Sequence, residues 1–370
     1  MKYSVDTNSA KTAYMQLYEQ LRRDIINFVY KYGEKLPSKR NLANETFTSV
    51  ITVEHAYEIL CDEGYIESRE RKGYFVTYRK GDFVPIAENE VPVPQASNNH
   101  RYNTSEFPFS VLAKTMRNII TKYGQELLIK SPNAGCFELR KALCDYLARS
   151  KGIEISYNQI IIGSGAEYLY GLIVQFLGRD RIYAVENPSY EKIRSVYRAN
   201  GAECDLLKLG KDGILTSQLA ETKASVLHIT PFRSFPSGIT ASASKRNEYI
   251  KWAQDRSAVI IEDDFNSEFT VSTKNEDTVF SLEPKRCVIY MNTFSKTIAP
   301  SMRIGYMVLP EELVDDFFSK MGFYSCTVPV FEQYVLAEFI ANGDFERHIN
   351  RTRKKLRQML KINNQQDKKN

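Results

Sequence analysis

The chain has 370 residues, of which 43% are hydrophobic and 26% are charged, enough for one large α/β domain with a smaller module. Its formal net charge of +5 does not by itself indicate a polyanion partner, and six scattered cysteines with four histidines predict neither a disulfide scaffold nor a metal centre. No apolar run reaches the length of a membrane span and the N-terminus lacks a signal-peptide core, so we expect a soluble, cytoplasmic protein.

The first segment, residues 1–78, has the pattern of three helices followed by two short strands. Apolar residues at helical spacing predict the first helix: Tyr14, Leu17, Tyr18, Leu21, Ile25 and Phe28. Ser38 stands where an N-cap belongs before a short second helix. Another apolar stripe predicts the third helix: Val53, Ala56, Tyr57 and Leu60. The stretch "EGYIESRERKGYFVTY" then predicts two strands around a basic tip, so the segment is typical of a winged helix-turn-helix.

Two stretches of this segment, "GEKLPSKRNLANE" and "TVEHAYEILCDEGYIESRERKGYFV", resemble the DNA-binding domain of GntR-type bacterial repressors. The third helix is expected to enter the major groove from its N-terminal end, while the cations between the strands meet phosphate. The first 80 residues carry 13 basic and 11 acidic side chains, so this expectation rests on pattern and not on bulk charge. We predict a double-stranded DNA operator as partner, contacted by Ser38, Arg40, Ser49, Thr52, His55, Arg69, Arg71 and Lys72.

The start of the third helix departs from the GntR pattern. The family usually has Ser-Arg there and this chain has Ser49-Val50, so a contact to phosphate or base is lost, and a lower affinity or an unusual operator is expected. Glu54 and Glu58 on the same helix are also unfavourable beside DNA. The alternative is a winged helix used only for protein contacts.

The rest of the chain is expected to form a linker, an α/β domain and a tail. Residues 79–105 predict an extended linker, because they hold prolines and small polar residues and no long apolar stripe. Residues 106–355 alternate helical patterns with the strand-like runs "QIIIGSG", "RIYAVE", "SVLHIT", "AVIIEDD" and "RCVIYMNT". This alternation predicts a largely parallel sheet with ligands beyond the carboxyl ends of its strands. Residues 356–370 predict a polar tail.

Two of the predicted strands are followed by residues suited to a phosphate and a flat ring. In "IIIGSGAEYLYGLI", Ser164, Gly165 and Ala166 lie between a strand and a helix, where free backbone N–H groups can receive a phosphate. Tyr190 follows the next strand and is available to stack on a ring, although packing is the more common role of a tyrosine there. A glycine-rich turn alone is weak evidence for either function.

Two further strands are followed by carboxylates and a lysine. Asp263 or Asp264 can hold a pyridine nitrogen protonated, or can simply cap a helix or turn. In "VIYMNTFSKTIAPSMRIGY", Lys296 can carry an aldehyde as a Schiff base while neighbouring hydroxyls and Arg303 bind its phosphate. The ordinary readings are a surface lysine and an arginine in an ion pair. The joint order of these residues along the chain is what the ordinary readings do not explain.

Four stretches resemble the aminotransferase-like domain of MocR-family regulators, which has fold type I and depends on pyridoxal phosphate: "SPNAGCFELRKALCDYLARSKGI", "TPFRSFPSGIT", "VIIEDDFNSEF" and "VIYMNTFSKTIAPSMRIGYMVLP". The resemblance implies Lys296 as the Schiff-base lysine, Asp263 as the pyridinium partner and Tyr190 as the stacking residue. It implies a phosphate cradle of Ser164, Gly165, Ala166, Thr293, Ser295 and Arg303. It also implies a head-to-tail homodimer in which each winged helix crosses to the partner's large domain.

Three departures from the MocR pattern bear on activity. The family usually reads Asp-Asp-Tyr, and Phe265 here removes a phenol from the cofactor's ring oxygen. The family's Ser-His-Gln is replaced by Phe232-Arg233-Ser234, and Arg233 either meets an effector carboxylate or points to solvent. Family members also continue into a small C-terminal domain with an arginine for the substrate's carboxylate, and we expect that domain to be largely absent here.

The predicted architecture is an N-terminal winged helix-turn-helix plus an α/β, fold-type-I aminotransferase-like domain. The predicted function is a transcription regulator of the MocR type that senses an amino compound or pyridoxal 5'-phosphate through a Schiff base on Lys296. One alternative is a working aminotransferase, against which Phe265 and the missing arginine argue. A second alternative is a DNA-binding protein whose aminotransferase-like domain is truncated and inactive.

Overall fold

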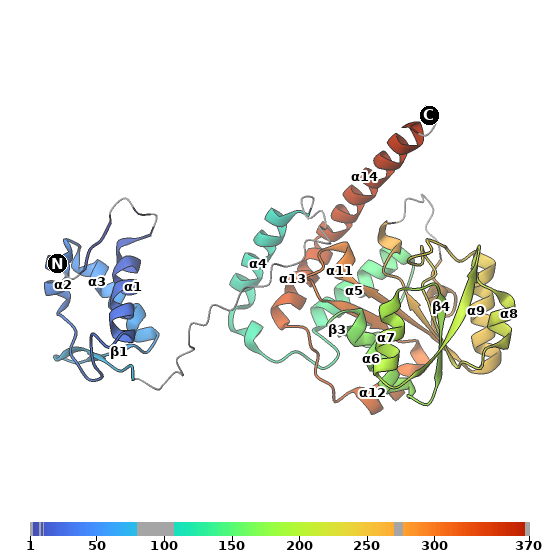
Figure 1. Cartoon of the computed structure of the whole chain (residues 1–370), viewed down its shortest axis with the longest axis horizontal. Helices are drawn as coiled ribbons and strands as arrows, with labels where there is room; N and C mark the ends of the chain where they lie inside the picture. The colour runs from blue at the N-terminus through green and yellow to red at the C-terminus, as the bar shows by residue number, and fades with distance from the viewer. Residues whose placement is uncertain (1–2, 7–8, 10, 80–106, 270–276, 367–370) are drawn as a thin grey trace. The chain divides into compact units, whose positions relative to one another are not determined.

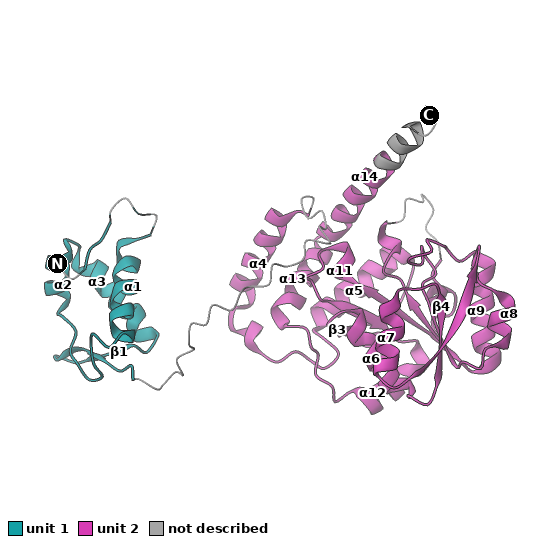
Figure 2. Cartoon of the chain, in the orientation of Figure 1, with its two compact units in different colours: residues 1–97 teal, residues 98–370 magenta. Residues whose placement is uncertain are grey.

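Residue contacts divide the chain into two units, residues 1–97 and 98–370, in this computed structural model (Figure 2). The structure describes residues 3–6, 9, 11–79, 107–269 and 277–366. Of the linker predicted at 79–105, only Arg79 falls within these ranges, and the rest lies outside the described residues. Each unit is built around its own buried apolar residues.

The first unit has the three helices and two strands that its sequence predicts, namely α1 (Ala13–Ile26), α2 (Lys39–Thr46), α3 (Val50–Asp62), β1 (Ile66–Arg69) and β2 (Gly73–Val76). Ser38 and Ser49 cap α2 and α3 by accepting hydrogen bonds from backbone N–H groups in the first turns. The predicted first helix was too long by two residues. It ends at Ile26, and Phe28 lies beyond it with a positive φ of 58° and a half-exposed ring.

The second unit alternates helices with strands along most of its length (Figure 1). Its helices are α4 (Phe109–Tyr123), α5 (Phe137–Lys151), α6 (Ala166–Leu177), α7 (Glu191–Ala199), α8 (Thr216–Glu221), α9 (Ala243–Arg256), α10 (Val279–Leu282), α11 (Phe294–Thr297), α12 (Val314–Met321), α13 (Val330–Ala341) and α14 (Asp344–Gln366). Short 3-10 turns are η2 (Gly124–Leu128), η3 (Tyr157–Gln159), η4 (Ser267–Phe269) and η5 (Glu311–Leu313). Helix α14 extends into the range predicted as a polar tail.

The strands of the second unit are β3 (Ile160–Gly163), β4 (Ile182–Asn187), β5 (Glu203–Gly210), β6 (Gly213–Ile214), β7 (Val226–Ile229), β8 (Val259–Asp263), β9 (Val288–Thr293) and β10 (Gly305–Val308). They form one sheet in the order β3-β10-β9-β8-β7-β4-β5-β6. Strands β5, β4, β7, β8 and β9 are mutually parallel, whereas β10 is antiparallel to both β3 and β9 and β6 is antiparallel to β5. The predicted α/β architecture with a largely parallel sheet is confirmed.

Helices cover both faces of this sheet (Figure 1), and the buried apolar side chains form one core on each face. Helices α5, α9 and α13 pack on one face, and α6, α7 and α12 pack on the other. Along β8, Ile260 joins the first core and Ile261 joins the second, because successive side chains of a strand point to opposite faces. None of the helices within the described ranges is both long enough and apolar enough to cross a bilayer.

Candidate functional site

The residues predicted to bind phosphate meet at one edge of the sheet because β10 runs against its neighbours. Gly305, the first residue of β10, pairs in register with Gly163 at the end of β3 and with Thr293 at the end of β9. Arg303 therefore comes just before β10 at this edge. Ser164 follows the end of β3 at the same edge, and Thr293 is the last residue of β9 there. The antiparallel strand brings together segments that are far apart in the sequence.

Helix α6 presents an uncapped N-terminus to this edge. Gly165 is its N-cap residue and supplies no side-chain hydrogen bond, so the first backbone N–H groups of the helix keep free donors. Gly165 has a φ of +92°, and a Cβ built on it would lie 3.2 Å from Nη2 of Arg303. The guanidinium of Arg303 thus lies against the backbone that begins α6. Donors, a positive helix end and a guanidinium are what a phosphate requires.

Two of the three predicted hydroxyl ligands, Thr293 and Ser295, lie beside Arg303 and hydrogen-bond backbone carbonyls. Thr293 Oγ1 donates to the carbonyl of Ile304 over 3.2 Å, and Ser295 Oγ donates to the carbonyl of Met302 over 3.0 Å. Arg303 is also engaged, because its Nη2 lies 3.0 Å from Oε2 of Glu167. The structure therefore groups all the predicted phosphate ligands and adds one carboxylate that the sequence reading did not include.

Asp263 lies at the end of β8 and is buried to 1% exposure. Its Oδ2 accepts a hydrogen bond from the hydroxyl of Tyr170 and lies 3.6 Å from Nε2 of His228. His228 is oriented in turn by Tyr197, whose hydroxyl is 2.5 Å from Nδ1. Within the described residues, Oδ1 of Asp263 makes no hydrogen bond. A buried carboxylate oxygen of this kind calls for a donor, such as a protonated pyridine nitrogen.

Tyr170 and His228 were missed by the sequence reading. Tyr170 is four residues into α6, and its hydroxyl reaches a strand end 93 positions later. The burial of the phenol, together with the Asp263 carboxylate, raises the pKa of Tyr170 well above its ordinary value, so it remains a hydrogen-bond donor. The one available signal was a lone histidine within the apolar strand β7.

Lys296 lies in the short helix α11, where its amine is partly desolvated. Its Nζ donates to Oδ1 of Asn266 and lies 4.8 Å from the ring centroid of Phe265. Desolvation and the neighbouring Arg233 guanidinium lower the pKa of Lys296, whereas Asp263 acts in the opposite direction. The lowered pKa increases the fraction of neutral amine, which is the nucleophilic form.

Arg233 lies close enough to this amine to affect its pKa, and Tyr190 lies on the loop before α7. Arg233 adopts a positive φ of 51°, and its Nη1 is 3.4 Å from the carbonyl of Phe269. Tyr190 precedes α7, is 37% exposed, and contacts the ring of Phe235 edge-on at 6.2 Å between centroids. The exposed face of Tyr190 is compatible with stacking, and its role stays a prediction.

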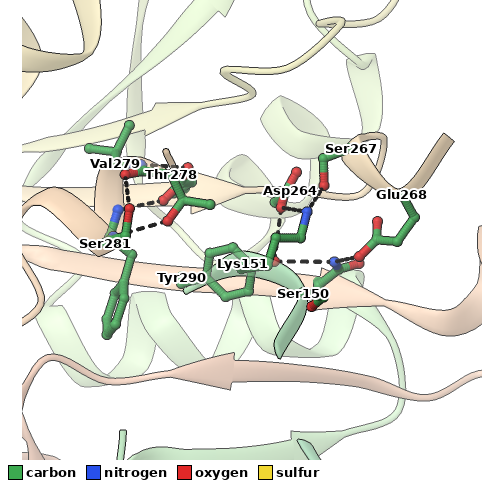
Figure 3. Close-up of polar contacts among 12 residues, drawn as sticks. Ser150, Lys151, Asp264, Ser267, Glu268, Thr278, Val279, Ser281 and Tyr290 are labelled. Atoms are coloured by element: carbon green, nitrogen blue, oxygen red, sulfur yellow. Dashed lines mark hydrogen bonds and ion pairs between the residues drawn. The ribbon is translucent and has the colours of Figure 1, made fainter. Parts of the chain in front are cut away.

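A second buried polar cluster lies around Lys151 and Asp264, next to Asp263 in the sequence (Figure 3). Lys151 at the end of α5 pairs with Asp264 at 3.0 Å and donates to Ser267, while the hydroxyl of Tyr290 also donates to Asp264, over 2.9 Å. Burial raises the pKa of Glu268 in the same cluster. These contacts fix the segment that leads from β8 to η4, and with it Phe265 and Asn266 beside Lys296.

The predicted DNA contacts lie on α2, α3 and the β1–β2 hairpin of the first unit. Ser38 and Ser49 act as helix caps, and Thr52 hydrogen-bonds Ser49 through both its N–H and its hydroxyl. The remaining predicted residues all have solvent-exposed side chains: Arg40, His55, Arg69, Arg71 and Lys72. Glu54, which we expected to be unfavourable beside DNA, pairs with Lys39 of α2 at 2.5 Å.

Comparisons with known proteins match both units. The family described as aminotransferase class I and II matches residues 93–363, and the gntR family of bacterial regulatory proteins matches residues 13–76. The HTH-type transcriptional regulator YdeL of Bacillus subtilis is 36% identical over 94% of this chain and 78% of its own. The probable rhizopine catabolism regulatory protein MocR of Rhizobium meliloti is 27% identical over 97% of this chain and 78% of its own.

Among solved structures, a kynurenine aminotransferase of Pyrococcus horikoshii, in complex with PMP, is 28% identical with a TM-score of 0.62. The match covers 68% of this chain and 64% of that one, so the chain spans slightly less than two thirds of the length of this aminotransferase. The solved structures support the fold of the second unit, and the two family matches cover both units. The chain belongs to the MocR-type family of HTH transcriptional regulators, which join a gntR-family domain to an aminotransferase class I and II domain.

Proposed function

We propose that this regulator binds pyridoxal 5'-phosphate in its second unit and uses that site to sense the cofactor or an amino compound that reacts with it. The observation that carries the proposal is the buried Oδ1 of Asp263, which makes no hydrogen bond to any described residue and lies at the same end of the sheet as Lys296 and Arg303. Each of the three groups suits a different part of the cofactor: the ring nitrogen, the aldehyde and the phosphate.

Asp263 would accept a hydrogen bond from the protonated ring nitrogen, and Tyr170 with His228 would hold the carboxylate in place from its other oxygen. The start of α6 and Arg303 would bind the phosphate, with Thr293 and Ser295 beside them. When bound, the cofactor supplies an aldehyde that condenses with amines and a ring that withdraws electrons. The lowered pKa of Lys296 prepares its amine to react as the neutral nucleophile.

The first unit would read an operator through α3 and the cations of the β1–β2 hairpin. Ser49 caps α3, and Thr52 and His55 near its start are not buried in the core. Their side chains can therefore contact base edges and phosphates. A homodimer would present two such units to a paired operator site. The second unit has apolar side chains that suit a partner subunit, since Phe109, Ile120, Leu128 and Ile129 are each more than half exposed.

The same geometry permits transamination, but a regulatory role has more support. The gntR-family domain gives the chain a DNA-reading element that a metabolic aminotransferase does not need. Phe265, which occupies the position beside Lys296, has no hydroxyl to hold the cofactor's ring oxygen. Multiple turnover with amino acid and keto acid would indicate an enzyme, whereas a change in DNA affinity on the same addition would indicate a sensor.

Titration of the purified chain with pyridoxal 5'-phosphate, followed by visible absorbance, tests the proposal. We expect an absorbance band in the native chain and in Lys251→Ala, an exposed lysine of α9, and none in Lys296→Ala. Reduction with borohydride followed by peptide mapping should place the modification on Lys296. A band that persists in Lys296→Ala, or modification of another lysine, would contradict the assignment of the site.

DNA binding is tested separately by selection from a random duplex library with and without the cofactor. A regulator should enrich a defined sequence, and the enrichment should change when the cofactor or a reacting amine is present. Lys296→Ala should enrich the same sequence but should not respond to the addition. Failure to enrich any sequence would leave the first unit as a protein-contact module.

A further inference from the structure

We propose that Glu167 is an internal competitor of the cofactor's phosphate for Arg303, which makes pyridoxal 5'-phosphate a dissociable ligand of this chain. The inference rests on the proposed function, because it concerns the same cradle. It goes further in assigning a role to a carboxylate that lies where an anion is to be bound. The competing group belongs to the protein itself.

The contacts of Glu167 define the competition. Its Oε2 lies 3.0 Å from Nη2 of Arg303, and its Oε1 lies 2.9 Å from Nζ of Lys192 at the start of α7. The same Nη2 is the atom that a Cβ on Gly165 would approach to 3.2 Å. The pair is therefore formed at the backbone of the predicted cradle and not at a distance from it.

Glu167 also lies at the positively polarised N-terminus of α6, where the phosphate would bind. It lies in the first turn of α6, where the uncapped helix end favours negative charge. The hydrogen bond from Lys192, and then the proximity of Arg303, lower the pKa of Glu167, so the carboxylate is ionised near neutral pH. A phosphate placed at the same helix end would be repelled by this carboxylate unless Glu167 moved away or shared its two cations.

The exchange is feasible because all three side chains are partly solvated. The side chains of Arg303, Glu167 and Lys192 are 51%, 39% and 59% exposed. An ion pair with that exposure favours the paired over the separated arrangement by a factor of about two to five. This is enough to reduce the affinity for a phosphate without excluding it. A cofactor held in this way would be released when its concentration falls, which suits a sensor more than an enzyme.

Two ligands that differ only in the phosphate separate this role from a general effect on the site. We would titrate the full chain with pyridoxal 5'-phosphate and with pyridoxal, and follow the visible band and the fluorescence of Trp252. Glu167→Gln should tighten the binding of pyridoxal 5'-phosphate about threefold to tenfold and leave pyridoxal unchanged. Glu191→Gln is the matched control, because it removes a carboxylate from the first turn of α7. Within the described residues, Glu191 pairs with neither Arg303 nor Lys192.

Each outcome decides the matter. Equal tightening for both ligands, unchanged affinity, or weaker binding of pyridoxal 5'-phosphate by Glu167→Gln would each overturn the competition. An equal gain in Glu191→Gln would show a general charge effect and overturn it as well. If neither the native chain nor Glu167→Gln binds either ligand, both the inference and the proposed cofactor site fail. If only Glu167→Gln binds pyridoxal 5'-phosphate, the competition is stronger than proposed, and it is supported.

Discussion

The ammonium group of Lys151 lies 3.0 Å from Oδ2 of Asp264, and the two side chains are only 10% and 0% exposed (Figure 3). Burial opposes the charge on the lysine, but Asp264 and Glu268 more than offset it and raise the pKa of Lys151. A buried pair of this kind adds little stability compared with apolar packing, yet loss of one partner leaves a charge without compensation. The pair joins the C-terminus of α5 to the segment that carries Asn266.

Lys151→Met should lower the free energy of unfolding of the second unit by about 3–5 kcal/mol, because the Asp264 carboxylate is left buried and unpaired. Lys141→Met on the same helix is the control, since Lys141 pairs with Asp145 at 2.5 Å with both side chains about half exposed. That change should cost less than about 1 kcal/mol. Urea unfolding followed by the fluorescence of Trp252 measures both. Equal costs would show that the Lys151 pair is not buried in solution.

Glu186 on β4 predicts a pH dependence of stability. Burial raises the pKa of Glu186 to about 7 from an ordinary value of 4.5, although Ser234 donates a hydrogen bond to it over 2.6 Å. The folded chain keeps this proton up to about pH 7, whereas the unfolded chain loses it near pH 4.5. The folded state thus binds more protons in this window, and the free energy of unfolding falls as the pH rises through it.

Glu186→Gln should reduce this fall by roughly 3 kcal/mol between about pH 4.5 and pH 7, and the buried Glu262 and Glu268, whose pKa values are also raised, should maintain the remainder. Urea unfolding at several pH values in that window compares the variant with the native chain. Glu203→Gln, an exposed carboxylate of β5, should leave the slope as it is. A slope as steep in Glu186→Gln as in the native chain would mean that Glu186 is ionised in the folded chain.

Gly165→Ala should weaken the binding of pyridoxal 5'-phosphate, because the added Cβ would press on Arg303 at 3.2 Å from Nη2. The positive φ of Gly165 also costs about 1 kcal/mol or more of stability for any residue with a side chain. Gly152→Ala separates the two effects, since Gly152 has a φ of +65° with nothing within 4 Å of its Cβ position. Both variants should unfold more easily, and only Gly165→Ala should lose affinity in an absorbance titration.

Glu54→Gln should strengthen DNA binding, because it releases Lys39 from the 2.5 Å pair to contact phosphate. We expect the affinity for a random-sequence duplex to rise about threefold to tenfold, and the slope of log K against log salt to steepen by about one. Glu58→Gln is the control, because Glu58 is exposed on the same helix and, within the described residues, pairs with no cation. A rise in affinity without a change of slope would mean that Lys39 makes no phosphate contact.

Patterns local in the sequence predicted most of the fold. The apolar runs that became β3, β4, β7, β8 and β9 are buried almost throughout, so composition alone marks them as strands. Strand β5 was not predicted, because its mixed burial leaves neither a continuous apolar run nor a clean alternation. The first helix was extended to Phe28 because spacing carries no information about the positive φ that ends the helix.

The site was predicted as a set of residues but not as a set of contacts. Strand ends carry Asp263, Lys296 and Arg303, and the family resemblance supplies a role for each. The hydroxyl of Tyr170 and the carboxylate of Glu167 could not be assigned, because their partners lie 93 and 136 positions away in the sequence. Such pairings depend on strand order, and strand order is set by packing over the whole sheet.

During synthesis β3 leaves the ribosome long before β10. In the folded sheet, β10 lies between β3 and β9 and pairs with both. Until β10 is made, the Gly163 end of β3 and the Thr293 end of β9 lack the strand that pairs with both, and the proposed phosphate cradle cannot assemble. The first unit has its own core and lies wholly ahead of these strands. Because domains fold as they emerge, a nascent chain forms its gntR-family domain before it completes the site that we propose for the cofactor. A product of arrested translation or proteolysis between the two units would hold DNA and be insensitive to the cofactor.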